Sequence, residues 1–148
     1  MRSLNFYTRF IDLASEINSA MPAFVVGKLT RILNNYSIPA KGSKILILGL
    51  AYKKDVPDTR ESPVLEIITE LLNLNADVSW FDDLVIGGSY PGKRVKELSA
   101  AALKSADAVV IAADHSHFDY DFIVGNAKIV FDLRNVTRGK KGKKIHKL

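Results

Sequence analysis

Short apolar runs alternate with helical patterns from residue 44 onward, and this alternation constrains the fold more than any other feature. The run Lys44–Leu50 is continuously apolar after its lysine, as expected of a strand that is buried on both faces of a sheet. Strands that alternate with helices form parallel sheets through βαβ units, so we predict an α/β fold with helices on both faces of the sheet. The predicted strands are residues 44–50, 77–81, 106–112 and 128–131, and the predicted helices between them are residues 62–75, 95–105 and 119–124.

A long helical segment precedes this alternation. Apolar side chains recur at three- and four-residue steps in residues 4–36, which places them on one face of a helix. Pro22 suits the first turn of a helix, so the segment is either one long helix bent at Pro22 or two helices. Its apolar face needs a partner, and residues 37–43 are predicted to be a linker. The residues of this face are Leu4, Tyr7, Phe10, Ile11, Ala14, Ile17, Met21, Val25, Leu29, Ile32 and Tyr36.

Composition excludes several classes of protein. The chain contains no cysteine, which excludes disulfides, thiolate metal sites and a thiol nucleophile, and is typical of a reducing compartment. A membrane span needs roughly 18 consecutive apolar residues, and no run approaches that length. The N-terminal residues lack the apolar region of a signal peptide. We therefore expect a cytoplasmic protein with no membrane partner.

The net charge of +5 comes from the C-terminal residues. Residues 138–148 hold six of the 21 Lys and Arg residues and no acid, so the rest of the chain, with 15 basic and 16 acidic residues, has a net charge of −1. Such a tail can bind nucleic acid or anionic lipid. We favour a frayed, solvated terminus and no nucleic-acid partner, because no aromatic residue interleaves the charges to stack on bases.

Polar residues follow every predicted strand. In an open α/β sheet the ligand lies outside the carboxyl ends of the strands, so these residues indicate a site, although ordinary loop polarity explains them about equally well. They are Tyr52, Lys53, Lys54 and Arg60 after the first strand, Asp82 and Asp83 after the second, Asp114, His115 and His117 after the third, and Asp132 and Arg134 after the fourth.

The loop after the first strand does not follow the dinucleotide-binding pattern. That pattern needs Gly-x-Gly-x-x-Gly so that backbone can approach a pyrophosphate, and the stretch beginning at Gly49 has one glycine. Asp82 lies 33 residues beyond Gly49, further than the roughly 20 residues expected of a ribose-binding acid. No P-loop pattern occurs either.

The same loop offers cationic side chains instead. Lys53 and Arg60 can neutralise a diphosphate, and the helix that begins at Ser62-Pro63 adds N–H donors. Tyr52 is an aromatic residue beside these charges. We expect Lys54 and Asp55 to form a solvated pair, and an ion pair of Arg60 with Glu61 at the helix start is the alternative to a binding role.

Other chemistries fit less well. His115 and His117 have a spacing that metal ligands can use, but no further cluster completes a site, so we predict no metal. No serine has the setting of a catalytic nucleophile. A flavodoxin-like phosphoacceptor module, with Asp82, Asp83 and Asp114 as its acidic pocket, is the alternative function, although no lysine follows the last strand where such a module needs one.

The stretch GLAYKKDVPDTRESP, residues 49–63, resembles the UDP-glucose/GDP-mannose dehydrogenase family in its C-terminal, UDP-sugar-binding domain. The stretches EINSAMP, VSWFDDLV, ADAVVIAADHSHFDYDFI and IVFDLRNVTRG extend the resemblance along most of the chain, with Asp83 where proline is common in the family. The pattern Asp-His-x-x-Phe-Asp-Tyr from Asp114 resembles the branch that oxidises UDP-N-acetylglucosamine or UDP-N-acetylmannosamine.

This resemblance implies a Rossmann-like domain of an enzyme that oxidises C6 of a nucleotide sugar to a carboxylate with two NAD. It implies that Tyr52, Lys53 and Arg134 bind the UDP-sugar and that Arg60 lies near NAD. It divides the chain into the end of the central-domain connecting helix (residues 1–37), the UDP-sugar-binding domain (residues 38–137) and the basic tail (residues 138–148).

The family's NAD domain and catalytic cysteine motif are absent from these 148 residues. The resemblance therefore implies an excised domain, a truncated product or one piece of a split enzyme, with no catalytic residue of its own. We expect no dehydrogenase activity from this chain by itself, and a homodimer formed through the N-terminal helix.

Overall fold

A computed structural model describes the backbone of residues 2–148 and the side chains of residues 8–148. Within these residues the chain forms one six-stranded sheet, in which every pair of neighbouring strands is parallel and the order is β3-β2-β1-β4-β5-β6. This is the strand order of dinucleotide-binding Rossmann folds. The predicted α/β class is therefore confirmed. The strands are β1 Lys44–Leu48, β2 Asp77–Phe81, β3 Lys93–Arg94, β4 Ala108–Ile111, β5 Val130–Asp132 and β6 Ile145–Lys147.

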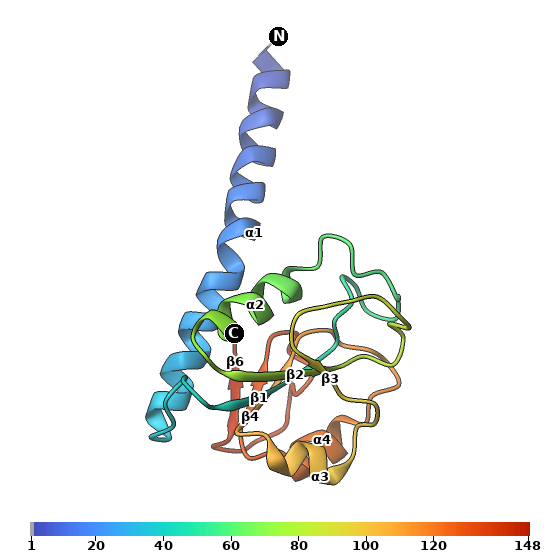
Figure 1. Ribbon diagram of the computed structural model, residues 1–148. Coiled ribbons are helices and arrows are strands. Elements are labelled where there is room, and N and C mark those ends of the chain that lie inside the picture. The colour runs from blue at the N-terminus through green and yellow to red at the C-terminus, as the bar shows by residue number, and fades with distance from the viewer. Residues whose placement is uncertain (1) are drawn as a thin grey trace.

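Helices cover both faces of the sheet (Figure 1). Ile45 and Ile47 of β1 point into the core shared with α1 and α2, whereas Leu46 and Leu48 point into the core shared with α3 and α4. This alternation follows from the two-residue period of a strand, and it explains why β1 is apolar at successive positions. The helices are α1 Arg2–Asn35, α2 Pro63–Asn73, α3 Ala100–Ser105 and α4 Tyr120–Asn126.

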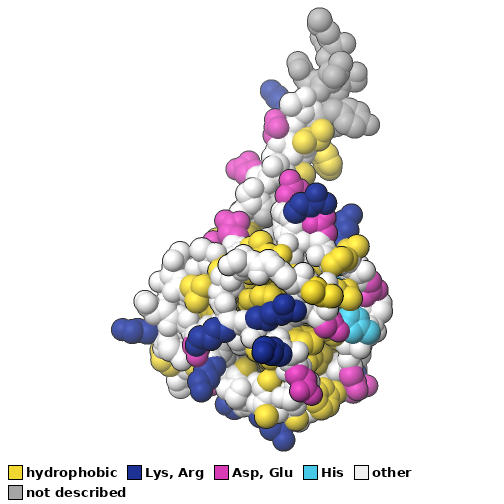
Figure 2. Space-filling view, turned by 45° about the vertical axis from the view of Figure 1, so that its right-hand side comes forward, with side chains coloured by type: hydrophobic (Ala, Val, Ile, Leu, Met, Phe, Trp, Pro, Cys, Tyr) yellow, Lys and Arg dark blue, Asp and Glu magenta, His cyan; other side chains and the backbone are white. Residues whose placement is uncertain are grey.

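The N-terminal segment is a single helix that contains Pro22. The C-terminal half of α1 is buried against α2 and the sheet through residues such as Val25 and Leu29. Its N-terminal half projects away from the sheet (Figure 1) and carries exposed apolar side chains (Figure 2). Phe10 is 69% exposed and Ile17 is 54% exposed. The predicted contributions of Leu4 and Tyr7 to the apolar face lie outside the described side chains. None of the helices within residues 2–148 has the length and apolar character of a membrane span.

The prediction that residues 138–148 form a frayed, solvated tail is wrong. Ile145–Lys147 is strand β6, which pairs with β5 at the edge of the sheet. Tyr36 at the end of α1 donates a hydrogen bond to the Lys143 carbonyl (2.9 Å) and lies 3.0 Å from His146 Nε2. Lys144 and Lys147 bond to Ala127 and Asn135 of the domain. This basic segment is therefore part of the folded domain, because its backbone completes the sheet and two of its lysines bond to neighbouring residues.

One predicted helix is shorter in the structure, and one further strand was not predicted. The helix expected over residues 95–105 begins at Ala100, because Ser99 is its N-cap and accepts a hydrogen bond from the Ala102 amide (3.1 Å). The residues before it include β3, a two-residue strand that was not predicted. Both residues of β3 are exposed and basic, so they carry no apolar pattern that would reveal a strand.

Candidate functional site

The strand order reverses between β1 and β4, and the loops that follow these two strands meet at the carboxyl edge of the sheet. Gly49, directly after β1, has φ +87°, and a Cβ at this position would lie 2.4 Å from the Ala113 Cβ and 2.7 Å from the Ala113 nitrogen. Only glycine fits this close approach. The single glycine that ends the apolar run is thus needed to bring the two loops together at the switch point, where ligands of open α/β sheets bind.

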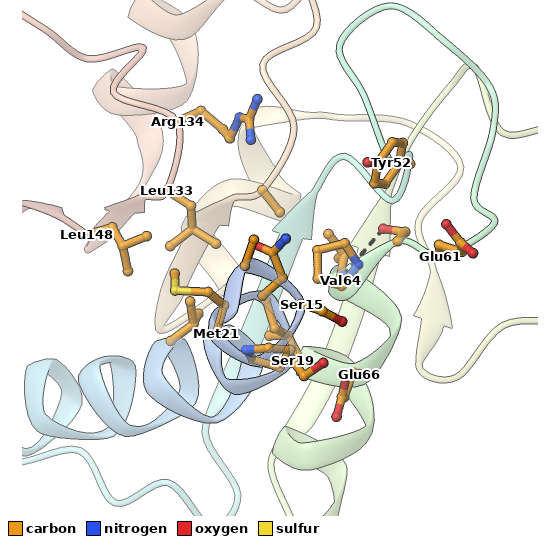
Figure 3. Close-up of a pocket in the computed structure, with 18 of the residues that line it drawn as sticks. Ser15, Ser19, Met21, Tyr52, Glu61, Val64, Glu66, Leu133, Arg134 and Leu148 are labelled. Carbon is orange, nitrogen blue, oxygen red and sulfur yellow. Dashed lines mark hydrogen bonds between the residues drawn. The ribbon is translucent and has the colours of Figure 1, made fainter. Parts of the chain in front are cut away.

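A pocket of about 940 Å³ lies at this edge, on the side of the sheet covered by α1 and α2 (Figure 3). Each strand that contributes to its wall does so from just beyond its carboxyl end. Tyr52 follows β1, Ala112 follows β4, Leu133 and Arg134 follow β5, and Leu148 follows β6. The other walls come from the exposed half of α1 and from the start of α2, so the pocket combines apolar side chains with a helix N-terminus.

The start of α2 has the predicted capping arrangement. Ser62 is the N-cap, its hydroxyl accepts a hydrogen bond from the Val64 amide (3.3 Å), and Pro63 occupies the first turn. Ser62 is buried, and residues 61–64 all line the pocket (Figure 3). The positive end of the helix dipole therefore opens on the pocket and favours a negatively charged ligand there.

Arg134 and Tyr52, two of the predicted site residues, flank the pocket from opposite sides (Figure 3). Asp132 fixes the turn that carries Arg134, because its buried carboxylate accepts hydrogen bonds from the Arg134 amide (3.0 Å) and from the amide and hydroxyl of Thr137 (2.8 and 2.6 Å). Arg134 Nε also donates to Asp114 (3.3 Å), and about half of its side chain is exposed. A cation and an aromatic ring thus face one cavity.

The other two predicted site residues do not line this pocket. Lys53 lies beside it, with its Nζ 5.5 Å from the centre of the Tyr52 ring. Arg60 forms a two-pronged ion pair with Asp58 (3.1 and 2.9 Å) and not with Glu61, so the alternative of an Arg60–Glu61 pair at the helix start is wrong. This pair lowers the pKa of Asp58 to about 2. The Arg60 side chain is 88% exposed, which leaves it accessible from outside the domain.

Asp82 is neither a ribose ligand nor an open acidic site. Its side chain is fully buried, and its Oδ2 accepts hydrogen bonds from the amides of Leu50 (2.7 Å) and Ala51 (3.0 Å) and lies 3.0 Å from His115 Nε2. A phosphoacceptor needs an exposed carboxylate, so this burial argues against the phosphoacceptor alternative. The Asp82 carboxylate instead holds the backbone at the start of the β1 loop.

The expected solvated pair of Lys54 and Asp55 is also wrong. Asp55 accepts hydrogen bonds from the Ser116 amide (2.7 Å) and hydroxyl (2.6 Å), and these bonds lower the pKa of its carboxyl. The Asp55 amide donates to His115 Nδ1 (2.9 Å). No local sequence pattern predicts these contacts, because their partners lie 60 and 61 positions apart in the chain.

The loop after β4 also forms hydrogen bonds with its own surroundings. Tyr120 donates to the His115 carbonyl (2.8 Å), and burial together with the charges of Asp114, Asp132 and Asp55 raises the pKa of this phenol. Tyr120 therefore stays protonated and keeps its donor role. His117 Nε2 lies 2.7 Å from Asp83 Oδ1. Among the described residues, no group of three His, Asp or Glu side chains is arranged to hold a metal ion.

The strand order, the pocket at the switch point and the helix N-terminus that opens on it define a nucleotide-binding domain of the Rossmann type. Comparison with known proteins gives the family. Residues 46–139 match the model of the "UDP-glucose/GDP-mannose dehydrogenase family, UDP binding domain", and the chain belongs to this family.

Individual relatives agree with this assignment. The chain is 36% identical to a UDP-N-acetyl-D-mannosamine dehydrogenase of Methanococcus maripaludis, over 92% of this chain and 32% of the relative. It is 34% identical to the UDP-glucose 6-dehydrogenase of Rickettsia prowazekii, over 86% of this chain and 31% of the relative. The structure of UDP-D-ManNAc dehydrogenase from Pyrococcus horikoshii superimposes with a TM-score of 0.74 at 30% identity, over 91% of this chain and 32% of that one. The chain thus spans about a third of the length of the relatives it matches.

Proposed function

We propose that this chain is the UDP-sugar-binding part of an NAD-dependent dehydrogenase that oxidises C6 of a UDP-N-acetylhexosamine to a carboxylate. The main support is the match to the UDP-binding domain, together with a pocket at the switch point that contains Tyr52 and Arg134. Relatives named for UDP-N-acetyl-D-mannosamine and relatives named for UDP-glucose have similar identities to this chain. The choice of an N-acetylhexosamine therefore rests on the pattern from Asp114 to Tyr120.

In this proposal the diphosphate lies between Arg134 and the N-terminus of α2. The guanidinium of Arg134 offers paired N–H donors to phosphate oxygens, and Asp114 restrains its Nε. The first amides of α2 and its dipole supply further stabilisation of negative charge. Glu61 also lines the pocket, and its carboxylate repels phosphate, so the diphosphate lies nearer to Arg134 than to Glu61.

Tyr52 and Lys53 complete the binding site from the β1 loop. Tyr52 is 48% exposed, so one face of its ring is accessible to a sugar or base. Lys53 lies close to this ring and adds a positive charge that a diphosphate can reach. Its long side chain can contact a bound nucleotide without lining the pocket itself.

NAD does not fit the β1 loop of this chain. In dinucleotide-binding folds the amides of this loop approach the pyrophosphate, but here those of Leu50 and Ala51 already donate to the buried Asp82. NAD, which accepts the hydride in the family reaction, would instead be held by another domain. The exposed Arg60 is the residue of this chain that we propose reaches it.

Two further proposals concern the chain by itself. It contains no cysteine for a thiohemiacetal, so we expect no NAD reduction when a UDP-sugar is added to the purified chain.

The exposed side chains of Phe10, Leu13, Ile17 and Phe24 recur at steps of three, four and seven residues along α1. This spacing supports a homodimer formed through α1, and a monomeric mass in sedimentation at micromolar concentration would contradict it.

Titration calorimetry with UDP, and with AMP as the control ligand, tests the binding function. We expect saturable UDP binding that is weakened at least tenfold in Arg134→Ala and in Lys53→Ala, since each change removes a charge-assisted contact worth about 1.5–3 kcal/mol. Lys104→Ala is the matched control, because Lys104 is an exposed lysine at the end of α3, on the amino side of the sheet. Equal UDP affinity in Arg134→Ala and Lys104→Ala would refute the proposed site.

A further inference from the structure

A buried polar cluster lies in the loops that follow β2 and β4, and its residues do not line the pocket. Asp82 and His115 have no exposed side-chain surface, yet both are ionisable. Burying such groups is costly unless all of their polar atoms find partners, and here they do. Asp82 Oδ2 binds the amides of Leu50 and Ala51 and the imidazole of His115, while Oδ1 accepts from the Leu84 amide (3.1 Å).

The hydrogen bonds determine the tautomer of His115. Its Nδ1 accepts from the Asp55 amide at 2.9 Å, so Nδ1 carries a lone pair and no proton. In the neutral imidazole the proton is then on Nε2, which donates to the Asp82 carboxylate at 3.0 Å. His115 therefore accepts a hydrogen bond from the β1 loop and donates one to Asp82, directly after β2.

A second link joins the same loops at the surface. Asp55 has φ +59°, a conformation that aims its carboxylate at the amide and hydroxyl of Ser116. The Tyr52 amide also donates to the Asp58 carbonyl (2.7 Å), which closes the loop on itself. The segment that carries Tyr52 and Lys53 is thus held at Ala51 on one side and at Asp55 on the other.

We propose that Asp82, His115 and Asp55 are positioning residues, which hold the Tyr52-Lys53 segment in its nucleotide-binding conformation before the ligand arrives. This inference rests on the proposed function, because it assumes that Tyr52 and Lys53 contact the UDP-sugar. Ordering a flexible loop upon binding lowers affinity, so a loop that is already ordered binds more tightly. The three residues act through the backbone and do not line the pocket.

The first test uses Asp55→Gly, an exposed change that keeps the positive φ and removes both bonds to Ser116. We expect UDP affinity to fall about tenfold while the melting temperature changes little, and Asp55→Asn to restore most of the affinity, because asparagine also adopts this φ and can bond to Ser116. Asn75→Gly is the matched control, since Asn75 also has φ +59° but lies between α2 and β2 at the opposite edge of the sheet. Equal UDP affinity in Asp55→Gly and Asn75→Gly would overturn the proposal.

The second test measures loop order without a ligand. His115→Gln places an amide N–H donor where His115 Nε2 faces Asp82, but it has no acceptor at the position of Nδ1, so by NMR we expect exchange of the Asp55 amide to rise at least tenfold. A merely structural role would instead raise exchange of core amides such as Val110 to the same extent, and that result would overturn the proposal. If His115→Gln does not fold, Asp55→Gly decides the matter by the same comparison, which sets exchange of the residue 55 amide against exchange of the Val110 amide.

If the wild-type chain gives no heat with UDP, the proposed function is wrong, and amide exchange alone then decides whether the cluster orders the loop.

Discussion

Replacing Gly49 with alanine is the sharpest test of how the β1 and β4 loops fit together. Alanine at φ +87° is strained by about 1–2 kcal/mol. Its methyl group would also lie 2.4 Å from the Ala113 Cβ and 2.9 Å from the Ala113 Cα, so the backbone of one loop must move. Overpacking of this kind costs a further 1–3 kcal/mol or so, which gives a total of about 2–5 kcal/mol for Gly49→Ala.

Gly42→Ala separates the two contributions. Gly42 has φ +80°, and no described atom lies within 4 Å of the Cβ that alanine would add, so this variant should lose about 1–2 kcal/mol from strain alone. Urea denaturation followed by circular dichroism gives both free energies of unfolding. The reasoning is refuted if Gly49→Ala and Gly42→Ala lose the same stability.

A compensating change makes the test more specific. Ala113→Gly removes the nearest Cβ, but the Ala113 nitrogen would still lie 2.7 Å from the new methyl group. We therefore expect the double variant Gly49→Ala, Ala113→Gly to recover only part of the lost stability. Full recovery would mean that side-chain contact alone, and not the approach of two backbones, requires glycine at position 49.

Two further predictions concern single contacts. Arg60→Ala should raise the pKa of the Asp58 carboxyl from about 2 toward its ordinary value of 3.8, because the ion pair with Arg60 is the main cause of the shift; an NMR pH titration that finds no rise would contradict this. Tyr36→Phe removes the hydrogen bond to the Lys143 carbonyl and should cost about 0.5–1.5 kcal/mol of stability, with faster amide exchange in β6, and unchanged exchange there would show that Tyr36 does not hold this strand.

The sequence predicted the elements whose burial leaves a pattern. β1 was found because residues 45–48, which are buried on both faces of the sheet, are all apolar. α2 was found because Ser62-Pro63 is a cap followed by a periodic helix. The strands β3 and β6 were missed for the opposite reason. β3 consists of two exposed basic residues, and β6 is a three-residue, partly buried strand at the other edge of the sheet. Both form because a neighbouring strand offers backbone partners.

For the candidate site, the sequence predicted where some residues lie but not which hydrogen bonds they form. Tyr52 and Arg134 were expected at the carboxyl edge of the sheet because both follow strands, and both line the pocket there. The partners of Asp55 and His115 were not identified, since a hydrogen bond between residues some 60 positions apart has no local signature. Asp82 was considered as a ribose ligand and as a phosphoacceptor because it follows a strand. Its role depends on its burial, which is a property of the packed structure.

The contact of Tyr36 with the β6 segment also bears on the order in which this domain folds. Tyr36 bonds to partners 107 and 110 positions later, so these contacts close almost the whole domain into one loop. Contacts between residues that are distant in the chain form late, and they make folding slower. The chain loses the entropy of closing the loop before the contacts stabilise it. During synthesis, β5 leaves the ribosome before β6, because it precedes β6 in the chain. The nascent domain therefore has an open edge at β5 until residues 145–147 emerge, and this is the stage at which we expect it to be most susceptible to aggregation.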